Sequence, residues 1–318
     1  MSPLDPQKTV SPRDLARAIG MSESSLKRWA DQGILEVTRT AGGHRRIQVK
    51  EAIRFVRSRK LSLAVPSALG LSGRLSEVFS VQGVAGSDGF PGNKGLPPEA
   101  SPFVRLLEAG DGEAAELQLM GAFLSGTSIA DIGDRMIRPA LEYLGHGPHG
   151  AEEILKEHRA TQVCLQAIEQ MRAMSTADQP TFRAVGGGAS GDAYMLPTLL
   201  VAAVIEESGG RATNLGANTP VSALRCEVFS SKGDSPRADL IWLSVSDPIT
   251  DPDEQASLYK LIDECTHYNV HMILGGRASK SLELPTGEPT CFSVHDCLCD
   301  INEAVQQLFG SSKSRFSA

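Results

Sequence analysis

The chain has 318 residues, a hydrophobic fraction of 41% and a formal net charge of −7, which is typical of a globular protein with two or three domains. It contains neither an apolar run of about 18 residues nor an evident basic and apolar leader, so we expect neither a membrane-spanning nor a secreted protein. We therefore expect a cytoplasmic protein without a membrane partner, whose six scattered cysteines are reduced thiols.

Charge is distributed unevenly along the chain. Residues 1–60 carry four Lys and nine Arg against three Asp and three Glu, a net charge of +7, which leaves −14 for the remainder. A basic head on an acidic body is typical of a protein that holds phosphates with one end only. This pattern favours a nucleic acid as the partner of the head.

Two short helices are predicted in the head. Ser11 can cap a helix that begins at Pro12, and Ser22 can cap a second helix, Glu23–Gln32, after a turn at Gly20. The second helix buries Leu26 and Trp29, which leaves its other side chains exposed, as a recognition helix in the major groove requires. The predicted DNA contacts from this helix are Ser24, Ser25, Lys27 and Arg28.

A hairpin is predicted next, because two short strand-forming segments within residues 37–47 flank Gly42-Gly43. Its basic side chains lie where a wing meets the DNA backbone or the minor groove. They are Arg39, His44, Arg45 and Arg46.

The strings SPRDLARAIGMSESSLKRWADQGIL (11–35) and RTAGGHRRI (39–47) resemble the MerR/excisionase family. The resemblance implies a winged helix-turn-helix over residues 8–60 that binds double-stranded operator DNA. A helix-turn-helix used only for protein contacts is the alternative, and the arginine density of the hairpin argues against it. One small head covers little DNA, so a homo-oligomer is expected.

Composition changes after the head. Residues 61–101 contain seven Gly, four Pro and seven Ser, which predicts a flexible linker with a loosely tethered head. In residues 102–176 apolar side chains recur at helical spacing, which predicts a four-helix bundle. In residues 180–310 short apolar runs alternate with helices, which predicts a flavodoxin-like parallel sheet of Rossmann type. The predicted fold class is therefore α/β multidomain.

The C-terminal two thirds is similar to the bundle and Rossmann-like pair of cobalamin-binding proteins, which include light-responsive repressors of MerR type. The string SGDAYMLPTLLVAAVIEESGGRATNLGANTP (190–220) carries much of this resemblance, together with a Glu-His pair on the last bundle helix, a serine after a strand and a glycine pair. The implied pocket consists of Glu157, His158, Asp192, Tyr194, Ser244, Gly275 and Gly276.

Three positions depart from that family's pattern. The motif Asp-x-His-x-x-Gly becomes Asp192-Ala-Tyr194-Met-Leu-Pro197, so a phenol stands where the family has its cobalt-coordinating His. A phenol with a pKa near 10 is a poor substitute for imidazole. Pro197 replaces the loop glycine, and Gly147 replaces a Trp on the upper face of the cofactor.

Three functions remain open for the acidic region. In the first, it is a sensor and oligomerisation region that no longer coordinates cobalt and responds to another small molecule or to a protein. In the second, it binds a corrinoid whose cobalt has no ligand from the protein. A corrinoid carrier of a methyltransferase is the third, which leaves the basic head unexplained. We expect the first and no enzymatic activity, since no nucleophile or second carboxylate accompanies Glu157 and His158.

Other motifs are weak. Residues 186–191 fit Gly-x-Gly-x-x-Gly, but the next strand lacks the acidic ribose partner, which favours a tight turn after a strand. Cys291, Cys297 and Cys299 lack the usual zinc spacing, and a helix end separates His267 from His271. We therefore expect no metal site.

Overall fold

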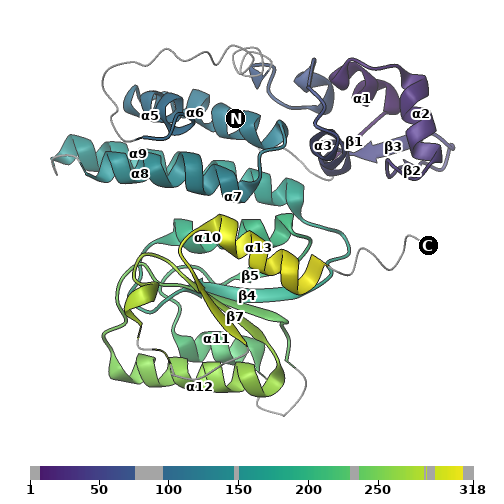
Figure 1. Cartoon of the computed structure of the whole chain (residues 1–318). Coiled ribbons are helices and arrows are strands. Elements are labelled where there is room, and N and C mark those ends of the chain that lie inside the picture. The colour runs from purple at the N-terminus through teal and green to yellow at the C-terminus, as the bar shows by residue number, and fades with distance from the viewer. Residues whose placement is uncertain are drawn as a thin grey trace. The chain divides into compact units, whose positions relative to one another are not determined.

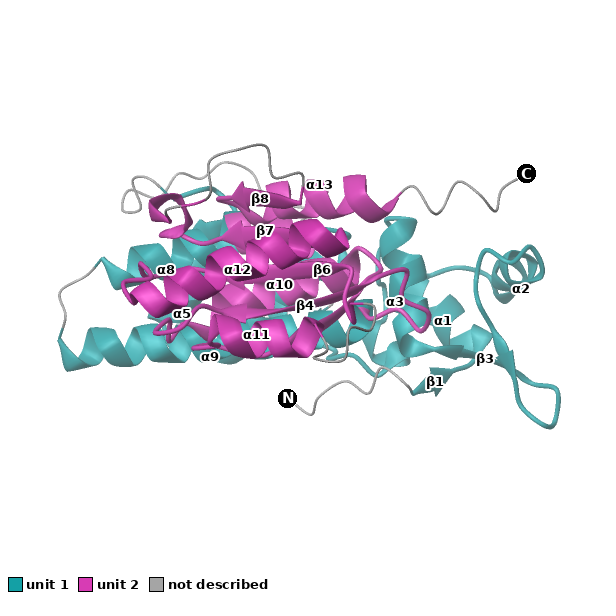
Figure 2. Cartoon of the chain, turned by 90° about the horizontal axis from the view of Figure 1, so that it is seen from below, with its two compact units in different colours: residues 1–128, 135–175 teal, residues 129–134, 176–318 magenta. Residues whose placement is uncertain are grey.

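The computed structural model describes residues 8–75, 96–146, 150–229, 236–282, 284 and 291–310. The chain forms two compact units, drawn in teal and magenta in Figure 2. Unit 1 comprises residues 1–128 and 135–175, and unit 2 comprises residues 129–134 and 176–318. Within the described ranges, no helix combines the length and the apolar character that a membrane span requires.

The N-terminal part of unit 1 consists of three helices and a small antiparallel sheet with strand order β1-β3-β2 (Figure 1). Two helices and the hairpin lie where the sequence predicts them, whereas the two-residue strand β1 is not predicted. The elements are β1 (Thr9–Val10), α1 (Pro12–Ile19), α2 (Glu23–Asp31), β2 (Thr38–Arg39), β3 (Arg45–Gln48) and α3 (Val49–Ser58).

Local capping explains where α1 begins. The Ser11 side chain accepts a hydrogen bond from the Asp14 amide (3.2 Å), and the Asp14 carboxylate accepts one from the Ser11 amide (3.1 Å). This reciprocal capping box satisfies two amides that a helix start leaves without partners. Gly20 ends the helix with a φ of 67°, a left-handed conformation that glycine adopts without strain.

The expectation of a flexible linker is wrong for residues 61–75, and residues 76–95 lie outside the described residues. Residues 61–75 pack against the head, with a 3-10 helix at Pro66–Leu69 and buried side chains at Leu69 and Leu75. The Val65 amide also donates to the Ala18 carbonyl of α1 (3.1 Å). Leucines within the Ser- and Gly-rich stretch supply the apolar area that this packing needs. The rest of the predicted short helix near Leu75–Val81 lies outside the described residues.

The expectation of a loosely tethered head is also wrong, because α3 packs on the bundle helices α6 (Gly112–Leu124) and α9 (Ala151–Ser175). Arg57 of α3 donates from Nε to the Phe123 carbonyl (2.7 Å) and from Nη2 to the Thr127 carbonyl (3.0 Å). Its guanidinium carbon lies 3.6 Å from the centroid of the Phe123 ring. Head and bundle thus belong to one compact unit.

The bundle helices of unit 1 are present where helical spacing predicts them. They are α5 (Ala100–Glu108), α6, α8 (Arg138–Gly145) and α9. A short helix, α7 (Ile129–Ile132), belongs to unit 2, and a π-helical turn, Gly133–Ile137, leads from it into α8.

Unit 2 is a five-stranded parallel sheet with strand order β5-β4-β6-β7-β8, which confirms the predicted α/β fold. This is the flavodoxin-like order, 2-1-3-4-5. Figure 1 shows α10 and α13 on one face of the sheet and α11 and α12 on the other. The bounds are β4 (Arg183–Gly188), α10 (Met195–Glu207), β5 (Arg211–Asn214), α11 (Val221–Val228), β6 (Leu240–Ser244), α12 (Pro252–Tyr268), β7 (His271–Gly275), β8 (Phe292–His295) and α13 (Leu298–Phe309).

The glycine run after Val185 is part of strand β4 and not the turn that the sequence predicts. A Cβ at Gly186 would lie 2.1 Å from the Trp242 ring, and one at Gly187 would lie 2.7 Å from the Thr219 hydroxyl oxygen. Trp242 is buried, and its indole nitrogen donates to the Thr198 hydroxyl (2.9 Å). These two glycines therefore make room for neighbouring side chains.

Candidate nucleic-acid interface and sensor region

Helix α2 has one buried face and one exposed face. Leu26 is buried, and half-buried Trp29 packs against Phe55 at a ring-centroid distance of 5.2 Å. Ser25 of the predicted contact set is half-buried, whereas the other three members are exposed. Those three are Ser24, Lys27 and Arg28.

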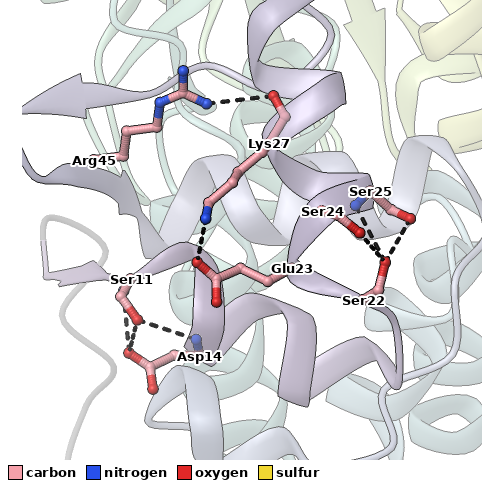
Figure 3. Close-up of polar contacts among 8 residues, drawn as sticks. All are labelled: Ser11, Asp14, Ser22, Glu23, Ser24, Ser25, Lys27 and Arg45. Atoms are coloured by element: carbon pink, nitrogen blue, oxygen red, sulfur yellow. Dashed lines mark hydrogen bonds and ion pairs between the residues drawn. The ribbon is translucent and has the colours of Figure 1, made fainter.

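The start of α2 is held by a small group of serines, shown in Figure 3. The Ser22 side chain caps the helix by accepting a hydrogen bond from the Ser25 amide (3.3 Å). Its hydroxyl also lies 2.9 Å from each of the Ser24 and Ser25 hydroxyls. One turn on, Lys27 Nζ lies 3.1 Å from the Glu23 carboxylate, so its charge is partly balanced within the helix.

The hairpin presents two of its four predicted basic residues to solvent. Arg39 and His44 are exposed, and the turn between the strands closes through a hydrogen bond from the Thr40 amide to the His44 carbonyl (2.9 Å). Gly43 has a φ of 77° in that turn. The chain reversal thus depends on the glycine that the sequence analysis places there.

The other two basic residues of the hairpin make contacts within the protein. Arg45 donates to the Lys27 carbonyl (3.3 Å) and to the Asp31 carboxylate of α2. Half-buried Arg46 lies near α1. The pKa of Asp14 is lowered, first by the hydrogen bond from the Ser11 hydroxyl and to a smaller extent by the charges of Arg17 and Arg46.

Two of the predicted pocket residues belong to unit 1. Glu157 is half-buried and His158 is exposed, and both lie on α9. Ile154 and Leu155, one turn earlier, are also exposed, at 44% and 48%. Gly147, the position that the resemblance assigns to a Trp, lies outside the described residues.

In unit 2, Asp192 joins two loops at the C-terminal edge of the sheet. Its side chain is 1% exposed and accepts hydrogen bonds from the Tyr194 amide (2.9 Å) and the Ser246 amide (2.7 Å). These loops follow β4 and β6, the neighbouring strands between which the strand order reverses. Ligands of doubly wound sheets bind at this switch point.

Tyr194 precedes α10 and is 48% exposed. The guanidinium carbon of Arg277 lies 5.4 Å from the centroid of its ring. Arg277 also donates to the Ser246 carbonyl (2.8 Å) and the Asp247 carboxylate (2.9 Å). Arg277, Ser246 and Asp247 are absent from the predicted pocket residues. Each of them follows the end of a predicted strand, and this position is the signal that could have identified them.

Pro197 lies in the first turn of α10 and not in a loop. The missing amide of a proline has no cost in the first turn of a helix.

The remaining predicted pocket residues have backbone roles. Ser244 ends β6 and is buried, and its carbonyl accepts a hydrogen bond from the Ala189 amide (2.8 Å). Gly275 ends β7 beside it, in register with Ser244. Gly276 has a φ of 102°, and a Cβ there would lie 2.5 Å from the Val245 carbonyl oxygen. The close approach of the Val245 backbone thus explains why position 276 is a glycine.

The side chains of this loop cluster do not fit protein coordination of the cobalt of a cobalamin. Both Asp192 oxygens accept backbone amides, and Tyr194 offers a phenol in place of an imidazole. Among all residues that the structure describes, no group of three or more His, Cys, Asp and Glu could hold a metal ion. Trp242 fills the space over Gly186 on the face of the sheet.

Comparisons with known proteins concern the fold. No protein-family model matches the chain, and no curated protein matches it. A monomethylamine corrinoid protein from Methanosarcina barkeri is similar in structure, with 13% identity, coverage of 66% of this chain and 98% of that chain, and a TM-score of 0.47.

Two further solved structures have lower TM-scores. A methanol:cobalamin methyltransferase complex from Methanosarcina barkeri has 13% identity and a TM-score of 0.32, and the match covers 73% of this chain and 89% of that chain. A cobalamin-binding protein from Desulfitobacterium hafniense has 14% identity and a TM-score of 0.31, with 65% and 96% covered. Likeness at these values assigns no ligand to this chain.

Proposed function

We propose that this chain is a DNA-binding transcriptional regulator, which holds operator DNA with α2 and the β2–β3 hairpin. One observation carries the proposal: a helix with an exposed Ser24, Lys27 and Arg28 and a hairpin with an exposed Arg39 belong to the same small, basic head. A helix of this kind fits the major groove, and hairpin cations reach the adjacent backbone.

The charge distribution supports this function. Residues 1–60 carry a net charge of +7 in a chain whose total is −7, so attraction to phosphates is confined to the head. The acidic remainder, with a net charge of −14, repels DNA on average and so favours contact through the head. We assign to this remainder the roles of sensor and of homo-oligomer interface, without enzymatic activity.

A binding experiment with the full-length chain tests this proposal. Fluorescence anisotropy would measure affinity for duplexes that the chain selects from a random double-stranded library, at several salt concentrations. We expect enrichment of one sequence and an affinity that falls linearly with salt on logarithmic axes. Failure to enrich any duplex, with no salt-dependent attraction to DNA, would refute the proposal.

A second candidate is a regulator that responds to a corrinoid. The observation that favours it is the flavodoxin-like strand order of unit 2, with Asp192 joining the two loops at the switch point. In this candidate a corrinoid binds at the switch point of unit 2 without a cobalt ligand from the protein.

Reconstitution separates these candidates. The full-length chain would be incubated with adenosylcobalamin or methylcobalamin in the dark, desalted and examined by visible absorbance. Retention of the chromophore with operator binding that changes on illumination would support the second candidate. Retention with methyl transfer and without any DNA binding would instead favour a corrinoid carrier, for which the basic head has no role.

A further inference from the structure

Strand β3 begins with two adjacent arginines that interact with different helices. Arg45 donates from Nη1 to the Lys27 carbonyl (3.3 Å) and from Nη2 to the Asp31 carboxylate, both in α2. Arg46 interacts electrostatically with Asp14 of α1. This division follows from strand geometry, because successive side chains of a strand point to opposite faces.

Arg45 and Arg39 are paired in register across the hairpin, yet their surroundings differ. The side chain of Arg45 is 22% exposed and has two partners in α2, whereas Arg39 is exposed. Like charges directly opposite each other destabilise an antiparallel pair. Asp31 offsets this repulsion and at the same time ties β3 to the C-terminal end of α2.

We propose that Arg45 is a positioning residue, which fixes the hairpin against α2 through Asp31, and that the phosphate contact of the hairpin belongs to Arg39. This inference rests on the proposed DNA-binding function and deepens it. The planar guanidinium of Arg45 has several N–H donors at fixed positions, so it can donate to a carbonyl and to a carboxylate at the same time. The single ammonium group of a lysine does not offer this geometry.

Substitution of Asp31 distinguishes a positioning role from a phosphate contact by the sign of its effect. If Arg45 neutralised a phosphate, Asp31→Asn would remove a competing negative charge and strengthen binding to every duplex. If Arg45 fixes the hairpin, the same change releases it and weakens binding to the operator. An exposed ion pair of this kind accounts for about a two- to fivefold change.

The test uses the full-length chain and two probes: the duplex that the chain selects from a random library, and a scrambled duplex of the same composition. Affinity and its salt slope would be measured for D31N, R45A and R39A. E36Q is the matched control, since it also removes one exposed carboxylate from the head, at a residue outside the predicted DNA contacts, and leaves the bond between Asp31 and Arg45 intact.

We expect D31N and R45A to lower the ratio of selected to scrambled affinity two- to fivefold while the salt slope stays unchanged. R39A should weaken both duplexes alike and reduce the magnitude of the slope by about 0.9, and E36Q should leave the ratio unchanged. Partial unfolding of a variant would lower both affinities equally, so it cannot produce the change in ratio.

Two results would overturn the inference while leaving the proposed function in place. One is tighter binding of D31N to both duplexes, and the other is a loss of salt slope in R45A as large as that in R39A. Absence of salt-dependent binding by the unsubstituted chain would instead refute the proposed function itself.

Discussion

At the scale of single residues, the buried carboxylate of Asp192 has the clearest structural role. It accepts the amides of Tyr194 and Ser246, which belong to two different loops, and is 1% exposed. A buried acceptor of this kind satisfies donors that water cannot reach. Asp192 therefore stabilises the loop pair at the switch point without any ligand.

We expect Asp192→Asn to lower the free energy of unfolding by about 2 kcal/mol, because an amide nitrogen would then face a backbone donor. Urea denaturation of the full-length chain would measure the change. Asp247→Asn serves as control, since that exposed carboxylate pairs with Arg277 at the surface and contributes less than about 1 kcal/mol. Equal stability of the two variants would contradict the role assigned to Asp192.

At the scale of elements, α1 begins at a capping box and α3 ends on the bundle. We expect Ser11→Ala to destabilise the protein by about 1 kcal/mol, since the cap satisfies the Asp14 amide. The Ser11 hydroxyl also donates to the Asp14 carboxylate and lowers its pKa, so the stabilisation from this second bond is present above the ordinary value of 3.8 and is lost as pH falls through the lower folded value. Thermal melts should show a larger difference between wild type and variant at pH 7 than at a pH well below 3.8, where Asp14 is protonated and the bond from its amide to Ser11 remains.

Arg57 provides the matching prediction for α3. Arg57→Ala removes two hydrogen bonds to carbonyls near the end of α6 and the contact with Phe123. We expect a loss of about 2 kcal/mol in the free energy of unfolding. The exposed Arg59 is the control, whose replacement by alanine should change stability by less than about 0.5 kcal/mol. A similar effect of both substitutions would show that α3 is not anchored through Arg57.

At the scale of the whole molecule, the proposed function requires more than one head, because a single head would cover too short a segment of DNA for strong specificity. We therefore expect two chains on each selected duplex, with half-sites about 10 base pairs apart from centre to centre. Sedimentation of the complex would give this stoichiometry. Tight and specific binding by one chain per duplex would contradict the expected homo-oligomer.

Short-range signals predict much of the fold. Ser11 and Ser22 mark the starts of α1 and α2 because a cap and its helix are adjacent in sequence. The alternation of short apolar runs with helices predicts the parallel sheet of unit 2. Contacts between residues that are distant in sequence cannot be predicted from such local signals. Gly186 is an example: its glycine motif predicts a turn, but the residue lies in strand β4, where Trp242 occupies the space that a side chain would need.

The candidate site shows the same limit. The exposed face of α2 follows from helical spacing, whereas the partnership of Arg45 with Asp31 depends on how the hairpin folds over the helix. Composition also misleads for residues 61–75, since the Ser and Gly content conceals leucines such as Leu69 and Leu75 that pack in the core.

The packing of α3 on the bundle has a consequence for the half-site spacing of the proposed operator. Because α3 packs on α6 and α9, the head is held against the bundle within one compact unit. If two chains bind one operator, as we propose, this packing would fix the spacing between their heads. We would then expect five extra base pairs between the half-sites to place one half-site on the opposite side of the double helix and to weaken binding.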